Sequence, residues 1–182
     1  AQGFNPYVAE WSPYHGAAYA VIEATARLVA AGANWSQARF SYQEYFERMD
    51  KQAERFGQPV AALLGSIEAQ IQLGLPSIGG KDSMSGTFEE LTVPPTLVAF
   101  GVTTADSRKV LSPEFKVAGE HIYYIPGQAL AQEIDFDLIK SNFAQFEALQ
   151  KAHKVTSASA VKYGGVVESL ALATFGNHIG AE

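Results

Sequence analysis

The segment Thr96–Val102 reads TLVAFGV, an almost unbroken apolar run that directly follows Val93-Pro94-Pro95. The two prolines exclude a helix interior at this point. A short apolar run bounded in this way is typical of a β-strand that is covered on both faces. The chain must therefore build a sheet and also supply the layers that bury it.

Helical spacing dominates the sequence before this strand. Ser12-Pro13 is a typical helix start, and apolar residues then recur at intervals of three and four as far as Gly32. The same spacing predicts a second helix over Ser36–Arg55, which Gly57-Gln58-Pro59 ends. We expect a third helix to end at Gly74, so that the chain up to this point is helical. One apolar face of the third helix consists of Val60, Leu63, Leu64, Ile67 and Ile71.

The second half of the chain has a different pattern. Residues 106–119 form a link, and Glu120–Ile125 (EHIYYI) predicts a second strand. Two further helices are expected over about Asp135–His153 and Ala160–Phe175. This order of helices, strands and helices predicts an α/β or α+β fold in which parts of two domains meet near the link.

The composition excludes several classes of function. The 182-residue chain has a formal net charge of −6 and no basic run, which argues against nucleic acid as a partner. It has no cysteine, and its four histidines lack the spacing of a zinc site. No segment approaches the ~20 apolar residues of a membrane span, and no leader is present, so a cytoplasmic location is expected. The start at Ala1 without Met and the end soon after the last helix suggest an excised piece of a longer polypeptide.

The segment SIGGKDSMSGTF, residues 77–88, carries the most suggestive chemistry. Gly79 and Gly80 permit positive φ and allow backbone N–H groups to approach an anion closely. Lys81 supplies a positive charge and Ser83 a hydroxyl donor, while Asp82 supplies a carboxylate for Mg²⁺ or for a hydroxyl group. A phosphate-binding turn and a plain solvated turn both stay open at this point.

Other motifs give weaker signals. A P-loop is excluded because Leu75 stands where that motif requires Gly. Glu23 and Arg27 lie four residues apart on the first helix, which is also the pattern of an ordinary surface ion pair. His15 lies beside the start of this helix, where either an anion site or a solvated histidine is expected. No Ser-His-Asp, HExxH or paired-carboxylate arrangement supports hydrolytic chemistry.

Several segments together resemble one family. Pro76–Ser85 (PSIGGKDSMS), Val93–Val102 (VPPTLVAFGV) and Ala105–Val110 (ADSRKV) are similar to the large phosphoribosylformylglycinamidine synthase, a glutamine-dependent enzyme of purine biosynthesis. The similarity extends to Pro13–Ala17 and Phe56–Gly65, so it covers most of the chain. The KDSMS sequence and the PPTLV strand after it are its most specific parts.

The resemblance implies a domain organisation. The synthase region of the family has two similar halves, each with an N-terminal and a C-terminal subdomain of the aminoimidazole-ribonucleotide-synthetase type. Residues 1–107 are then the latter part of the N-terminal subdomain of the second half, and residues 108–182 begin its C-terminal subdomain. The implied partners are the catalytic half and the glutaminase domain, both in the remainder of the same polypeptide.

The resemblance also implies a reaction and its ligands. The family converts formylglycinamide ribonucleotide, ATP and glutamine into the amidine, ADP, phosphate and glutamate. One half is catalytic, and the other, which this segment resembles, holds ATP or ADP with Mg²⁺ in an auxiliary site. Glu23 is the implied metal ligand. The expected nucleotide- or phosphate-binding residues are Gly79, Gly80, Lys81, Asp82, Ser83 and Arg27.

The chain departs from the family at the metal. Arg27 stands where bacterial relatives have Asn, and Ala160 stands where the family often has a metal-binding Asp. Because Ala cannot coordinate Mg²⁺, we expect the auxiliary site to have decayed, with basic side chains such as Arg27 and Lys162 in place of the metal. Two functions stay open. The chain is either a segment that contributes to the ligase site or a non-catalytic half that pairs with the catalytic half and docks the glutaminase.

Overall fold

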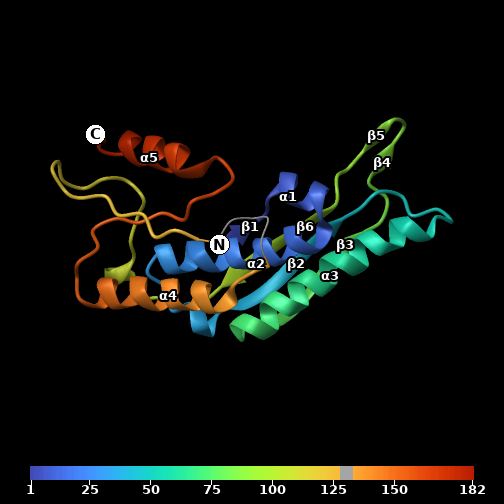
Figure 1. Ribbon diagram of the computed structural model, residues 1–182, viewed down its shortest axis with the longest axis horizontal. Coiled ribbons are helices and arrows are strands. Elements are labelled where there is room, and N and C mark those ends of the chain that lie inside the picture. Colours follow the sequence, from blue (N-terminus) through green and yellow to red (C-terminus); the bar gives the residue numbers. More distant parts are fainter. Residues whose placement is uncertain (128–132) are drawn as a thin grey trace. The chain divides into compact units, whose positions relative to one another are not determined.

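The computed structural model describes residues 1–127 and 133–182 (Figure 1). The described residues form two compact units, the first made of Ala1–Leu28 with Asn34–Thr104 and the second of Val29–Ala33 with Ala105–Glu182. The mixed α/β class expected from the sequence is confirmed. The assignment of residues 1–107 and 108–182 to two synthetase-like subdomains stays a prediction. Each helix in the described ranges is either too short or too polar to cross a lipid bilayer.

The first unit is built on a sheet with the strand order β1-β6-β2-β3. The central strands β6 (Thr96–Val102) and β2 (Arg39–Tyr45) are antiparallel, and β1 (Gln2–Gly3) pairs antiparallel with β6. The other edge strand, β3 (Ser77–Ser83), is parallel to β2. Parallel neighbours need a long crossover connection, and helix α3 (Ala53–Leu73) provides it.

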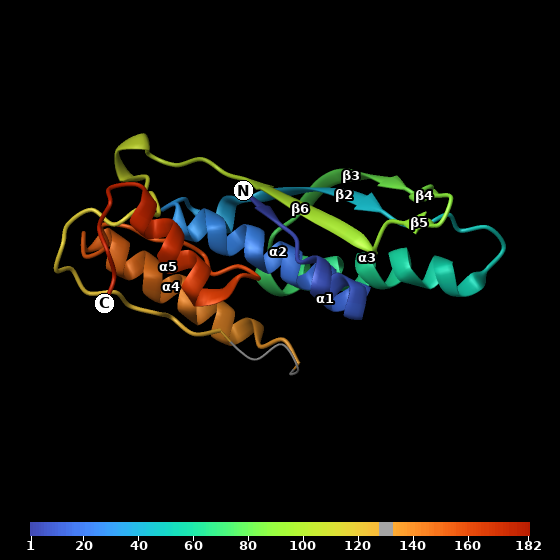
Figure 2. The same ribbon diagram turned by 90° about the horizontal axis from the view of Figure 1, so that it is seen from above.

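Helices α2 (Pro13–Ala30) and α3 lie on one side of this sheet (Figure 2). They approach each other closely because α3 presents Gly65, where a Cβ atom would lie 2.0 Å from the backbone carbonyl oxygen of Tyr14 in α2. The apolar stripe predicted for the first helix is confirmed as core. Its buried members are Ala17, Ala20, Val21, Ala24 and Leu28.

The predicted helix over Ser36–Arg55 is wrong. This region contains most of the 3-10 turn η1 (Trp35–Gln37), the strand β2 and the start of α3. Along β2, Phe40, Tyr42 and Glu44 are buried and alternate with less buried residues, which is the period of two expected for a strand. Aromatic residues fit both a helix and a strand, and pairing with two neighbouring strands decided between them.

Helix α3 is longer than predicted. It begins at Ala53 and runs through Gly57 and Pro59, which were expected to break it. A proline inside a helix removes one backbone hydrogen bond, and here the ring of Pro59 is buried on the packed face, which offsets that loss. The predicted end at Gly74 is confirmed, since this residue adopts the left-handed conformation with φ 68°.

The predicted strand Thr96–Val102 is confirmed as β6, but its burial on both faces is wrong. Leu97 and Ala99 are buried, whereas Phe100 and Val102 are exposed. The antiparallel pairing with β2 explains the difference, because antiparallel sheets often keep one face in solvent. One face of the sheet is therefore open to a partner.

The second unit contains α4 (Phe136–Lys151) and α5 (Gly165–Phe175). The first of these helices agrees with the prediction, and the second starts at Gly165 and not at Ala160. The predicted strand Glu120–Ile125 is wrong, since these residues have no regular secondary structure. No described strand pairs with them, and an unpaired strand is not stable. The remaining short elements are α1 (Pro6–Trp11), η2 (Ser107–Lys109), β4 (Thr87–Phe88) and β5 (Leu91–Thr92).

Candidate functional site

The predicted phosphate-binding turn is in fact the edge strand β3. Its glycines have a structural role in the pairing with β2. Gly79, with φ 147°, follows the register shift between Phe40 and Ser41, and a Cβ on Gly80 would lie 2.8 Å from the carbonyl oxygen of Tyr42. The expectation of a turn is therefore wrong, because glycines and polar side chains also suit an exposed edge strand.

Strand β3 divides the motif between the two faces of the sheet. Side chains alternate along a strand, so Lys81 and Ser83 lie on the open face while Asp82 lies on the face that the helices cover. The Lys81 ammonium is 5.7 Å from the centre of the Tyr45 ring, and the backbone carbonyl of Lys81 accepts a hydrogen bond from Gln43 Nε2 at 3.2 Å. Lys81 forms no ion pair with the described residues, so its charge is available to an anion.

Asp82 pairs in register with Glu44, a residue that the sequence did not point to. Glu44 is 1% exposed, and neither carboxylate oxygen has a hydrogen-bond partner among the described residues. Burial, and after it the neighbouring Asp82 carboxyl, raise the pKa of Glu44 to about 8. Glu44 is therefore mostly protonated at neutral pH, which keeps a charge out of the core.

Glu23 and Arg27 form the ion pair that their spacing allows. Nη2 of Arg27 lies 2.5 Å from one Glu23 carboxylate oxygen, and the backbone N–H of Phe4 donates to the other at 3.3 Å. The Nε of Arg27 is buried without a hydrogen-bond partner in the described ranges. Both oxygens of Glu23 are thus engaged, and a guanidinium stands where a bound cation would approach.

The two groups of predicted site residues do not come together. Glu23 contacts Phe4, directly after β1, and β1 and β3 are the opposite edges of the sheet. Three strand spacings of about 4.8 Å separate these edges by roughly 14 Å. One phosphate group therefore cannot contact both Arg27 and Lys81.

Two further candidate residues, His15 and Lys162, contact polar side chains of the chain itself. Nδ1 of His15 lies 2.8 Å from the Ser12 hydroxyl oxygen, which accounts for this histidine as part of the helix start. Lys162, near the start of α5, lies 3.6 Å from a carboxylate oxygen of Glu168. Neither residue faces a cluster of groups that indicates a ligand.

The residues present do not fit the Mg²⁺ ion that the family resemblance implies. No group of three or more His, Asp or Glu residues in the described part of the chain is arranged to hold a metal ion. Glu23 is occupied by Arg27 and Phe4, and Ala160 offers no donor atom. A hard divalent cation needs several oxygen ligands, and the described residues do not assemble them.

Solved structures share this fold. The chain matches T. maritima PurL complexed with ATP at a TM-score of 0.69 and 18% identity, over 95% of this chain and 28% of that one. T. maritima PurL complexed with ADP matches at a TM-score of 0.66 and 18% identity, over 92% of this chain and 26% of that one. Phosphoribosylformylglycinamidine synthase II from Thermotoga maritima matches at a TM-score of 0.58 and 16% identity, over 84% of this chain and 24% of that one. No protein-family model and no curated protein matches the sequence.

The chain thus spans about a quarter of each of these structures. The resemblance expected from Pro76–Ser85 and the strand after it is confirmed at the level of the backbone. This chain has the fold of a part of phosphoribosylformylglycinamidine synthase II.

Proposed function

We propose that this chain is a segment of a phosphoribosylformylglycinamidine synthase. The observation that carries the proposal is the fold match over 95% of the chain, together with the GGKDS motif on β3. The whole enzyme is an ATP-dependent carbon–nitrogen ligase of purine biosynthesis that uses glutamine as amide donor and acts in the cytoplasm. ATP converts the formamide oxygen of the substrate into a phosphate leaving group, and ammonia from glutamine takes its place on the carbon.

Lys81 and Ser83 are the residues of this segment that bind nucleotide phosphate. They lie on the same, open face of β3, and Lys81 has no ion pair with the described residues. An ammonium group beside a hydroxyl suits phosphate oxygens. Asp82 lies on the opposite face and contacts Glu44 instead. The T. maritima PurL structures complexed with ATP and ADP support a nucleotide as the ligand class.

The residues at the expected metal positions, Glu23 and Ala160, favour a second function, that of a non-catalytic half. Glu23 is held by Arg27, and Ala160 cannot bind a metal, which fits a half that has given up catalysis. The open sheet face with Phe100 and Val102 and the free edge of β3 are surfaces on which a similar half can pack. The chain would then pair with the catalytic half and help to dock the glutaminase domain.

Substitution of Lys81 tests whether this residue binds nucleotide phosphate. In the full-length polypeptide that contains this chain, Lys81→Ala should weaken ADP binding at this site by roughly tenfold, because one charge-assisted hydrogen bond is lost. Calorimetric titration measures the affinity, and circular dichroism checks that the fold is unchanged. Lys51→Ala, at another exposed lysine of the same unit, is the matched control and should bind as the unchanged protein does.

The same variants separate the two functions. Loss of ligase turnover with normal assembly supports a segment that contributes to the ligase site. Loss of pairing with the catalytic half, measured by sedimentation, supports the scaffold. If ADP affinity, turnover and assembly are all unchanged in Lys81→Ala, both roles of Lys81 are wrong.

A further inference from the structure

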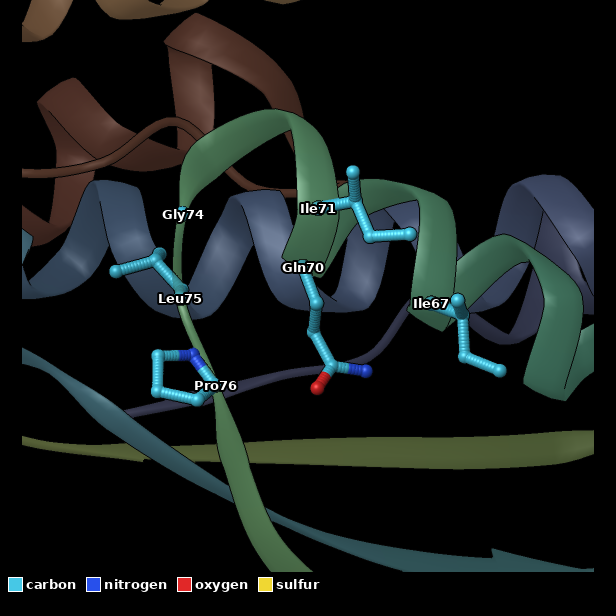
Figure 3. A pocket seen from close by; sticks show the side chains of 6 residues that line it. All are labelled: Ile67, Gln70, Ile71, Gly74, Leu75 and Pro76. Atoms are coloured by element: carbon cyan, nitrogen blue, oxygen red, sulfur yellow. The ribbon is translucent and has the colours of Figure 1, made fainter.

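Strand β3 is fixed in place where it leaves helix α3 (Figure 3). The side-chain oxygen of Gln70, in α3, accepts a hydrogen bond from the Ser77 N–H at 3.1 Å. The carbonyl of Pro76 accepts another from the Phe40 N–H of β2 at 3.1 Å. Leu75 is 1% exposed and anchors the turn in the core. The start of β3 is therefore held by side chains as well as by the backbone.

The rest of β3 depends on its backbone pairing with β2. Residues 77–82 are exposed, and even Ile78 is 80% exposed, so the strand gains little from side-chain packing. In the described part of the chain, β3 pairs with one strand, whereas β2 also pairs with β6 over its whole length. A weaker contact between β2 and β3 therefore displaces β3 and leaves β2 in place.

Glu44 lies on β2 beside the end of β3. It pairs in register with Asp82, so both side chains lie on the face that the helices cover. Glu44 is 1% exposed and is enclosed by residues of this chain, so its surroundings do not depend on what a longer polypeptide adds. Neither carboxylate oxygen has a hydrogen-bond partner among the described residues. A negative charge on Glu44 would therefore be buried without compensation.

The basic groups on the elements around Glu44 do not offset such a charge. Strand β6 carries no titratable side chain, and Arg39 of β2 and Lys81 of β3 lie on the opposite face of the sheet. Helices α1, α2 and α3 carry these acidic and basic residues: Glu10, His15, Glu23, Arg27, Glu54, Arg55 and Glu68. The two arginines in this list are paired with other carboxylates, and the histidine contacts the Ser12 hydroxyl. Burial raises the pKa of Tyr19 and of Tyr42, which keeps both phenols neutral.

Asp82 brings a like charge to Glu44 from the edge strand. Burial, and after it the Asp82 carboxyl, raise the pKa of Glu44 to about 8. When Glu44 loses its proton, two carboxylates oppose each other across the strand pair, which is destabilising. Separation of β3 from β2 moves Asp82 away and lets water reach Glu44. Ionisation of Glu44 therefore favours an opened β3.

We propose that Glu44 is a positioning residue for phosphate binding: its uncharged carboxyl group lets β3 stay paired with β2, and this pairing holds Lys81 and Ser83 together on the open face. Ionisation of Glu44 loosens β3 and weakens nucleotide binding. The inference rests on the proposed function, because it assigns to Glu44 the placement of the residues that bind phosphate there.

Hydrogen–deuterium exchange of the full-length polypeptide that contains this chain tests the effect of Glu44 on β3. From about pH 5 to 8, the protection factors of the β3 amides should fall by up to about tenfold per pH unit, because the opened strand releases the proton of Glu44. In Glu44→Gln they should not depend on pH, since Gln does not ionise. Asp82→Asn, at an exposed position, removes the like charge and should weaken the pH dependence. Glu90→Gln, at another exposed position, is the control and should behave as the unchanged polypeptide does.

This measurement distinguishes a positioning role from a merely structural one. If Glu44 only contributes to global stability, local opening of β3 leaves its proton in place, and the protection of the β3 amides does not depend on pH. The inference is overturned by that result, or by an equal pH dependence in Glu44→Gln and the unchanged polypeptide.

ADP titrations at the same pH values test the link to binding. The ratio of the ADP affinity of Glu44→Gln to that of the unchanged polypeptide, in which the titration of ADP itself cancels, should rise at least about threefold from pH 6 to 8. A constant ratio, where Lys81→Ala does weaken binding, overturns the inference. If Lys81→Ala leaves the ADP affinity unchanged, the proposed function fails instead, and a pH-dependent protection of β3 still supports positioning of the strand by Glu44.

Discussion

Replacing Glu44 with Gln should remove a loss of stability that the unchanged chain suffers as the pH rises from about 5 to 8. Folding raises the pKa of Glu44 from 4.5 to about 8. Between these values the folded state keeps a proton that the unfolded state has released, so the free energy of unfolding falls with rising pH. The stabilisation is complete below the unfolded-state pKa of 4.5 and is lost as the pH rises through the folded-state pKa of about 8. We expect a loss of about 1 kcal/mol per pH unit, roughly 3 kcal/mol in total.

Urea unfolding at several pH values in this range measures the effect. Gln has nearly the shape of protonated Glu and does not titrate, so the difference in stability between Glu44→Gln and the unchanged chain should grow as the pH rises. Glu90→Gln, at an exposed position, is the control and should keep the pH dependence of the unchanged chain. An equal pH dependence in Glu44→Gln and the unchanged chain would mean that Glu44 is not a buried acid.

Replacing Gly65 with Ala should lower the free energy of unfolding by about 3 kcal/mol, although Ala is the better helix former. The new Cβ atom would lie 2.0 Å from the carbonyl oxygen of Tyr14. This oxygen belongs to the backbone of α2 and cannot move by itself, so the two helices must separate and lose part of their packing.

Gly57→Ala, on the same helix, should have the opposite effect. Nothing lies within 4 Å of a Cβ atom at Gly57, so the helix gains propensity without a collision, and the chain becomes more stable by roughly 0.5–1 kcal/mol. Thermal or urea unfolding of the two variants compares them directly. A similar change in stability at both glycines is incompatible with the close approach of α2 and α3.

Parts of the fold follow directly from the sequence. The first long helix and α4 have clear start signals and a regular apolar spacing, and β6 has prolines before a short apolar run. Strand β2 could not be recognised in this way, because its aromatic residues fit a helical pattern equally well and its partners lie far away along the chain. The apolar face predicted for α3 is exposed in the structure, and this direction was hidden for a related reason. Periodicity identifies an apolar face but does not say which face packs.

The candidate site was predictable in position but not in geometry. The sequence pointed to Lys81 and Asp82 as one group, and only the strand conformation of β3 places them on opposite faces. The sequence does not point to Glu44, because the apolar spacing around this residue predicts a helix over Ser36–Arg55 where the structure has the strand β2. Recognising the alternation of Phe40, Tyr42 and Glu44 would have placed this carboxylate on a buried face. The ion pair of Glu23 and Arg27 follows from their spacing alone.

This chain should hold nucleotide phosphate through Lys81 without a metal ion, and an ADP titration tests this most directly. The titration uses the full-length polypeptide that contains the chain, with the catalytic nucleotide site blocked, and it is run once with a metal chelator and once with excess Mg²⁺. The affinity at the remaining site should agree within about twofold between the two conditions, a difference of roughly 0.4 kcal/mol. Binding that appears only with Mg²⁺, or no binding in either condition, would contradict a metal-free phosphate site on β3.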